Sequence, residues 1–83
     1  MLSLTEAKNK AVGYKQTLKK VEKGLAQKVY IAKDAEEKIL RPILELCQIQ
    51  GIPVVEVESM AELGKASGIQ VGSAVSAILK QQD

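Results

Sequence analysis

The sequence contains no histidine, tryptophan or phenylalanine, and it has a single cysteine, Cys47. Without histidine, the Ser-His and Cys-His pairs that activate nucleophiles cannot form, and zinc sites lose their commonest nitrogen ligand. One cysteine cannot close a disulfide within the chain, so side-chain packing must hold the fold together. We therefore expect no enzyme activity, no metal centre and no cofactor.

Aromatic side chains and long apolar runs are scarce too. Tyr14 and Tyr30 are the only aromatic residues, which argues against a platform on which several bases of a single strand stack. No apolar run approaches the roughly 18 residues of a membrane span, and the N-terminus lacks the apolar core of a signal peptide. The sequence thus predicts a cytoplasmic protein with no membrane partner.

The chain of 83 residues holds enough apolar material for one small domain. Apolar residues make up 46% and charged residues 27%, which is the composition of a globular protein. No repeat or linker divides it, so we expect a single domain over residues 1–83.

Charge is distributed unevenly along the chain. Residues 1–33 carry eight lysines against two acids, whereas residues 34–83 carry eight acids against four basic residues. A concentrated basic segment is typical of proteins that meet an anionic polymer or surface. The alternative is a solvated lysine-rich helix face without a ligand.

Helical spacing, capping patterns and β-prone runs divide the chain into short elements. Ser3 with Glu6, and again Ser59 with Glu62, have the spacing of a capping box. Together with glycine stop signals, the pattern predicts helices over 4–12, 17–24, 41–50 and 60–67, and extended segments or turns over 13–16, 28–32, 52–57 and 74–79. This alternation predicts an α/β fold, a three-layer α/β/α sandwich around a small mixed four-stranded sheet.

Two possible sites fail on inspection. The pair Gly64-Lys65 invites comparison with a phosphate-binding loop, but Ser59 stands where that motif needs glycine and Ala66 where it needs serine or threonine. Cys47 falls on the apolar face of a predicted helix and is interpreted as a core residue. Neither feature predicts a nucleotide triphosphate site or a catalytic group.

The segment from Gly13 to Lys19 is the most informative part of the sequence. Gly13 allows a turn, and Gln16 or Thr17 is expected at the start of the helix that follows. Lys15, Gln16 and Lys19 would then project from the positive end of that helix, where free N–H groups attract phosphate. Lysine can donate to guanine O6 and N7, and glutamine can bond base edges. The cluster therefore indicates nucleic-acid binding, with a solvated amphipathic helix as the alternative.

Four blocks of sequence carry a resemblance to a known family. The chain resembles the kink-turn RNA-binding family of ribosomal proteins, the L-seven-Ae family, and within it the short bacterial members. The resemblance covers nearly the whole chain and rests on residues 13–19 (GYKQTLK), 29–35 (VYIAKDA), 51–54 (GIPV) and 57–68 (VESMAELGKASG). The last block, at its distance from the first, is the most specific.

The resemblance implies a three-layer fold and binding to kink-turns, where tandem sheared G·A pairs bend an RNA duplex sharply. In archaeal members the first motif reads Gly-x-Asn-Glu-x-x-Lys. Gly13 and Lys19 match it here, whereas Lys15 replaces the asparagine and Gln16 the glutamate, as in the bacterial members. The likeness further implies that the loop Val57-Glu58-Ser59 lies against nucleotides splayed from the kink. It also implies that Lys33 approaches the RNA backbone and that Lys65 touches phosphate.

The sequence therefore supports two alternative functions. The first is a monomeric, ribosome-associated RNA-binding protein whose partner is a structured RNA containing a kink-turn. The alternative is a protein-interaction or scaffold module without nucleic-acid specificity, which would use the acidic second half of the chain to meet a basic partner.

Overall fold

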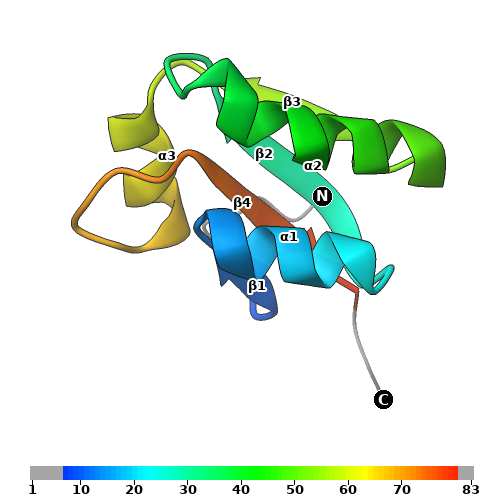
Figure 1. Ribbon diagram of the computed structural model, residues 1–83. Helices are drawn as coiled ribbons and strands as arrows, with labels where there is room; N and C mark the ends of the chain where they lie inside the picture. The colour runs from blue at the N-terminus through cyan, green and yellow to red at the C-terminus, as the bar shows by residue number, and fades with distance from the viewer. Residues whose placement is uncertain (1–6, 81–83) are drawn as a thin grey trace.

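The computed structural model describes residues 7–80. Three helices alternate with four strands along the chain (Figure 1). In order, the elements are β1 (Lys10–Val12), α1 (Tyr14–Glu22), β2 (Ala26–Ala32), α2 (Glu37–Gln50), β3 (Val54–Val57), α3 (Met60–Ser67) and β4 (Val75–Leu79). Among these residues no helix is long and apolar enough to cross a membrane.

The strands form one mixed sheet in the order β1-β4-β2-β3. β4 runs antiparallel to both of its neighbours, β1 and β2, whereas β3 runs parallel to β2. The last strand of the chain thus lies in the middle of the sheet, and β1 and β3 form its edges.

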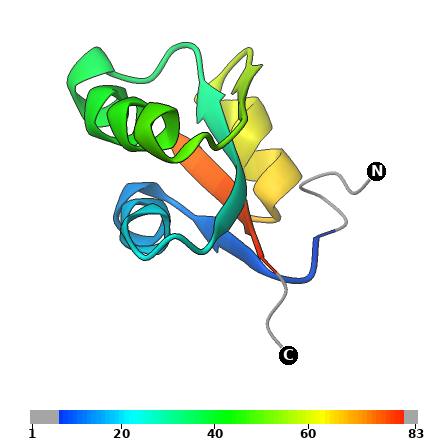
Figure 2. The same cartoon turned by 90° about the vertical axis from the view of Figure 1, so that its right-hand side faces the viewer.

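The helices cover both faces of this sheet (Figure 2). Val29 and Ile31 of β2 point into the larger core cluster, which includes Ile43 of α2 and residues of α1. The alternate residue Ala32 belongs to the smaller cluster with Leu63 of α3. α1 and α2 therefore share one face and α3 covers the other, which confirms the predicted three-layer α/β/α sandwich.

Several predicted boundaries agree with the structure. α3 covers residues 60–67, and Ser59 caps it by accepting a hydrogen bond from the Glu62 N–H at 3.1 Å. Gly51 and Gly68 follow α2 and α3 in the left-handed conformation, with φ of 70° and 87°. Pairing of β3 with β2 begins at Val54, directly after the proline that cannot donate to the ladder.

The predicted helix over 4–12 is wrong for the residues that the structure describes. Residues 10–12 form β1, which pairs with β4 from Lys10 opposite Ile78 to Val12 opposite Ser76. Ala11 is buried between two partly exposed neighbours, so its apolar spacing fits a strand once β4 supplies a partner. The Ser3–Glu6 capping box lies outside the described residues.

Two helices begin earlier than predicted. The segment 13–16, predicted as a turn or brief strand, supplies Gly13 as the cap and the first turn of α1 from Tyr14. α2 begins at Glu37, one turn before the predicted start, and contains Pro42. That extra turn buries Leu40 and holds the i,i+4 ion pair of Arg41 with Glu37 at 3.0 Å.

Candidate functional site

One end of the sheet collects most of the residues that the sequence singled out. β1, β2 and β3 all run toward this end and β4 starts from it. Backbone hydrogen bonds hold the four chain segments together here: Gly13 N to Val75 O at 2.9 Å, Ala32 N to Ala74 O at 3.0 Å, and Lys33 N to Val57 O at 2.8 Å. The start of α1, the β2–α2 turn and the β3–α3 junction are therefore neighbours.

The N-terminus of α1 has no side-chain cap and no acidic residue in its first turn. Its cap is Gly13, whose φ of 93° is left-handed, and whose carbonyl accepts the Thr17 N–H at 3.0 Å. By contrast, α3 has Ser59 as a cap and Glu62 in its first turn. The partial positive charge at the start of α1 is therefore not compensated by its own residues, which suits an anion.

Lys15, Gln16 and Lys19 are exposed on this helix, as predicted. Lys15 and Gln16 belong to the first turn, and Lys19 follows Lys15 by one turn on the same face. The Lys15 ammonium and the Gln16 amide can thus add donors to the backbone N–H groups at the helix start, and Lys19, in the last turn, extends the same face as Lys15.

Thr17 does not start the helix. Because α1 begins at Tyr14, Thr17 lies in its second turn and is fully buried. Its Oγ1 has no hydrogen-bond partner among the described residues. The helix start consists instead of Gly13, Tyr14 and the two exposed residues that follow.

Lys33 and Glu58 are paired with each other. The Lys33 ammonium donates to Glu58 Oε1 at 3.2 Å, and both side chains are largely exposed, at 49% and 75%. This hydrogen bond, then the negative charges of Glu58 and Glu56, raise the pKa of Lys33 above its ordinary value. A ligand phosphate at Lys33 would have to compete with the Glu58 carboxylate.

The β3–α3 junction is fixed from two sides. Asp34, in the β2–α2 turn, accepts the Met60 N–H at 2.8 Å, and Ser59 caps the same helix. Val57 is partly buried against the core cluster beneath α3. Of the predicted segment Val57-Glu58-Ser59, only the Glu58 side chain is fully exposed to solvent.

Lys65 is not brought to the same place. It is exposed in the last turn of α3, at the opposite end of that helix from Ser59. Gly68, which ends α3, lies against the side chain of Lys10 at the start of β1. Lys65 is therefore separated from the cluster at the start of α1.

Residues 68–74 form the loop between α3 and β4, and residues 69–73 of it belong to no predicted element. This loop runs back along α3: Ile69 N donates to Gly64 O, and Ser73 N donates to Met60 O, both at 3.0 Å. Between these two hydrogen bonds, the apolar side chain of Val71 is 71% exposed. Since the loop ends at Ala74 and Val75, beside Gly13, it borders the start of α1.

Buried serines anchor this loop. Ser67 and Ser73 both hydrogen-bond the hydroxyl of Ser76 in β4, at 2.8 and 3.2 Å. Ser73 also donates to Val75 O at 2.8 Å. The signal that would have drawn attention to the loop is Gly68 and Gly72 flanking apolar residues that belong to no predicted element.

Chemically, the free N–H groups at the start of α1 and the exposed lysine and glutamine of its first turn suit an anionic ligand. Within residues 7–80 no group of three or more acidic, cysteine or histidine side chains could hold a metal ion. Burial in the core cluster raises the pKa of the Cys47 thiol, which favours its protonated form.

Comparisons with known proteins match nearly the whole chain. The sequence model of the Ribosomal protein L7Ae/L30e/S12e/Gadd45 family matches residues 2–83. RNA-binding protein TTE2299 of Caldanaerobacter subterraneus subsp. tengcongensis is 48% identical over 68 residues, which cover 82% of this chain and 83% of that protein. Large ribosomal subunit protein eL8 of Halobacterium salinarum is 42% identical over 72 residues, which cover 86% of this chain and 60% of that protein.

A solved structure shares the fold as well. The Giardia lamblia 15.5kD RNA binding protein superposes with a TM-score of 0.80 at 32% sequence identity. The match covers 89% of this chain and 62% of that one.

Proposed function

The chain belongs to the Ribosomal protein L7Ae/L30e/S12e/Gadd45 family, and from that premise we propose that it is an RNA-binding protein that recognises kink-turns. The relative from Caldanaerobacter and the structural neighbour from Giardia are both named RNA-binding proteins, which supports RNA as the ligand. The proposal assigns the protein no enzymatic step.

The observation that carries the proposal is the N-terminus of α1, which has no side-chain cap: Lys15 and Gln16 are exposed in its first turn, and Lys19 is exposed one turn further along the face of Lys15. Sheared G·A pairs leave guanine edges open in the groove of the RNA. Lysine and glutamine can donate to those edges, while the helix N–H groups favour a nearby phosphate. One helix end thus combines base contacts with recognition of the bent backbone.

Three further residues, at different distances from this helix end, would contact the RNA. The exposed apolar Val71, on the loop that ends beside Gly13, offers a surface for a nucleotide that is unstacked at the kink. Lys33 would approach the RNA backbone from the β2–α2 turn with Glu58 beside it. Lys65, which lies apart, would contact phosphate only where a stem passes α3.

We also propose that the protein acts as a monomer in the cytoplasm, in association with ribosomes. A ribosomal subunit protein among its relatives supports the last point. Sedimentation of the purified protein would report its oligomeric state, and co-sedimentation with ribosomal subunits would report the association.

The direct test compares two RNAs of the same length and flanking sequence. One has a three-nucleotide bulge followed by tandem G·A pairs, and the other has Watson–Crick pairs in their place. Specific sites of nucleic-acid-binding proteins exceed non-specific ones by on the order of a thousandfold or more, so the kinked RNA should bind far more tightly. Equal affinity for the two RNAs would refute kink-turn recognition and favour a protein-interaction module.

A further inference from the structure

A second basic feature lies at the opposite end of the sheet. It is a hollow of about 460 Å³, a volume within the range of ligand sites. Among the lining residues that the structure describes, none is acidic and four are lysines, namely Lys8, Lys10, Lys20 and Lys80. The strands β1 and β2 begin here and β4 ends here, whereas the proposed kink-turn site lies where β4 begins.

Backbone hydrogen bonds fix the walls of this hollow. Leu25 N donates to Lys20 O at 2.9 Å, and Lys80 N donates to Leu25 O at 2.7 Å. Lys20 and Lys80 are thereby held on either side of Leu25. Across the hollow, Leu79 N donates to Asn9 O at 2.9 Å, which ties the start of β1 to the end of β4.

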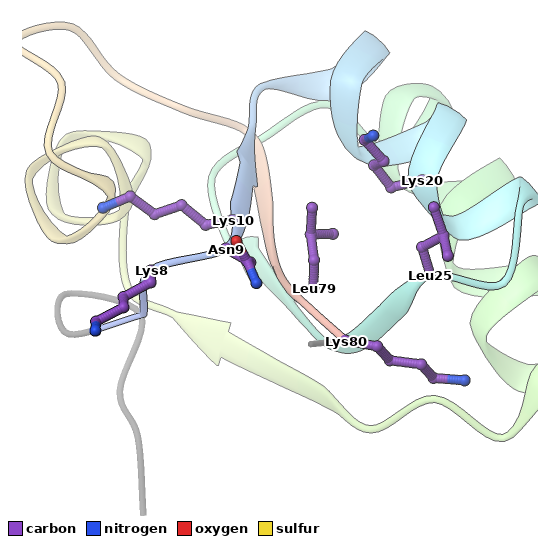
Figure 3. Close-up of a pocket in the computed structure, with 7 residues that line it drawn as sticks. All are labelled: Lys8, Asn9, Lys10, Lys20, Leu25, Leu79 and Lys80. Carbon is purple, nitrogen blue, oxygen red and sulfur yellow. The ribbon is translucent and has the colours of Figure 1, made fainter. Parts of the chain in front are cut away.

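Figure 3 shows Leu79 in the middle of the hollow, with Asn9 on one side and Leu25 on the other. Lys8 and Lys10 extend on the Asn9 side of Leu79 and away from it, whereas Lys20 and Lys80 lie toward the Leu25 side. Because lysine is a point charge on a flexible stem, the ammonium groups can turn inward toward a ligand.

Within residues 7–80, none of these lysines forms an ion pair with an acidic side chain. The two ion pairs within residues 7–80 join Lys33 with Glu58 and Arg41 with Glu37, so neither involves the hollow. Lys10 differs slightly from the others, because its ammonium lies against the C-terminal end of α3 at Gly68, where the helix dipole is negative. Lys20 and Lys80 are the clearest candidates to meet an external anion.

Helix α1 connects the hollow with the proposed site. Its start carries Lys15 and Gln16 at one end of the sheet, and Lys20 lies near its other end. Nine helical residues span about 13 Å, at about 1.5 Å each. Phosphates repeat along an RNA stem at spacings well below that length, so one stem laid along α1 presents phosphates to both ends.

We propose that this hollow is a second RNA contact, which binds backbone phosphates of a stem that continues from the kink; this inference rests on the proposed function. The contact is independent of base sequence, since it consists of lysine charges over an apolar floor. It predicts that the protein senses the length of the stem as well as the kink.

The experiment uses RNAs that share one kink and differ in stem length. Each stem in turn is lengthened by one helical turn, and affinity is measured for the wild type and for the double variant Lys20→Gln/Lys80→Gln. Lysine-to-glutamine changes keep much of the side-chain length while removing the charge. Lys20→Arg/Lys80→Arg restores the charge, and Lys38→Gln, at an exposed position of α2, is the matched control.

The wild type should bind one of the lengthened RNAs more tightly than the short one. The double glutamine variant should lose that gain but bind the short RNA normally, and the arginine variant should keep the gain. Each phosphate contact adds about a three- to fourfold loss of affinity between about 50 and 200 mM salt, so the glutamine variant should respond less to salt on the long RNA.

Two failures can be told apart. If neither lengthened stem tightens binding, or if the glutamine variant keeps the gain, the second contact is wrong, while tight binding of the short kinked RNA still supports the proposed function. If the short kinked RNA binds no better than its Watson–Crick control, the proposed function fails and the second contact fails with it.

Discussion

The backbone oxygen of Val71 occupies the space in which a Cβ on Gly64 would lie. The carbonyl carbon of Val71 and the Cα of Gly72 are also close to that position, at 3.0 and 3.1 Å. The loop over 68–74 can lie flat on α3 only because residue 64 has no side chain. The Gly64-Lys65 pair, which superficially suggests a phosphate loop, thus serves packing.

Replacing Gly64 with alanine should therefore destabilise the fold, although alanine favours helices. The backbone of Val71 and Gly72 must move to admit the methyl group. Overpacking of this kind typically lowers the free energy of unfolding by about 1–3 kcal/mol. For a domain of this size, each kcal/mol lowers the melting temperature by about 4–8 °C, which a thermal melt resolves. Lys65→Ala, at the exposed neighbouring position, is the control and should stay within about 0.5 kcal/mol. An unchanged melt for Gly64→Ala would contradict the close packing of the loop.

The cap at Ser59 gives a second stability prediction. Ser59→Ala removes the acceptor for the Glu62 N–H and should cost about 1 kcal/mol in the free energy of unfolding. Ser59→Asp keeps an acceptor that caps equally well and should remain near the wild type. Chemical denaturation of the three proteins provides the measurement. Equal losses for the alanine and aspartate variants would show that the hydroxyl does not stabilise α3.

The Lys33–Glu58 pair predicts a pH effect. The raised pKa of Lys33 means that the pair keeps both charges at and somewhat above the ordinary lysine pKa of about 10.4, and loses the attraction as the pH rises through the raised value. Glu58→Gln keeps an oxygen that can accept the hydrogen bond but removes the charge of Glu58, so it should lower the pKa of Lys33 toward its ordinary value, and Glu56→Gln should lower it less. NMR titration of the Lys33 side chain in alkaline solution measures both shifts.

The same substitution bears on RNA binding. Glu58→Gln frees the Lys33 ammonium and removes a negative charge from the proposed interface, so affinity for the kinked RNA should rise. If affinity instead falls while the fold is intact, the Glu58 side chain itself contacts the RNA, as the family resemblance suggested.

Salt should weaken binding of the kinked RNA. If lysines of the first half of the chain neutralise about four to six phosphates, affinity should fall about tenfold to a thousandfold between low and moderate salt. Titrations at a series of salt concentrations give the slope directly. A flat response would move the interface away from the lysine-rich surface.

Discrimination between kinked and paired RNA should depend on the start of α1. A good contact with a base edge favours the correct base over a wrong one by about 1–3 kcal/mol of binding free energy. Gln16→Ala or Lys19→Ala should therefore reduce the preference for the kinked RNA. Lys23→Ala and Lys28→Ala should instead weaken the binding of both RNAs to the same extent. Each should also lower the slope of log affinity against log salt concentration by about one unit per phosphate contact. A thermal melt of each variant checks that the fold is retained. Full discrimination by Gln16→Ala and Lys19→Ala would show that this helix end does not contact the G·A pairs.

The sequence predicts α3 and its cap accurately because the signals there are local. Ser59 and Gly68 act within one or two helical turns, and in the structure Ser59 caps the start of α3 and Gly68 follows its end, as expected. β1 has no such local signal, because its conformation depends on pairing with β4, whose residues follow it by more than sixty positions. Tertiary pairing therefore overrides the apparent helical spacing around Ala11.

In the candidate site, too, features that depend on local sequence could be predicted and features that depend on tertiary contacts could not. The exposed residues of α1 follow from helical spacing, so Lys15, Gln16 and Lys19 could be predicted on one helix end. The pairing of Lys33 with Glu58 could not, since these residues meet only when β2 and β3 align in parallel. The hollow between Lys20 and Lys80 likewise exists only in the folded chain, where α1 approaches the end of β4.

The central place of β4 has a consequence for synthesis of the chain on the ribosome. β1, made first, and β2 are both partners of a strand that is made last, so β1 has no neighbour in the sheet until residues 75–79 have emerged. The β2–α2–β3 unit, by contrast, can close as soon as its own residues are available. A nascent chain that lacks β4 would therefore leave two strand edges unpaired, and completion of the last strand would join the sheet in a single late step.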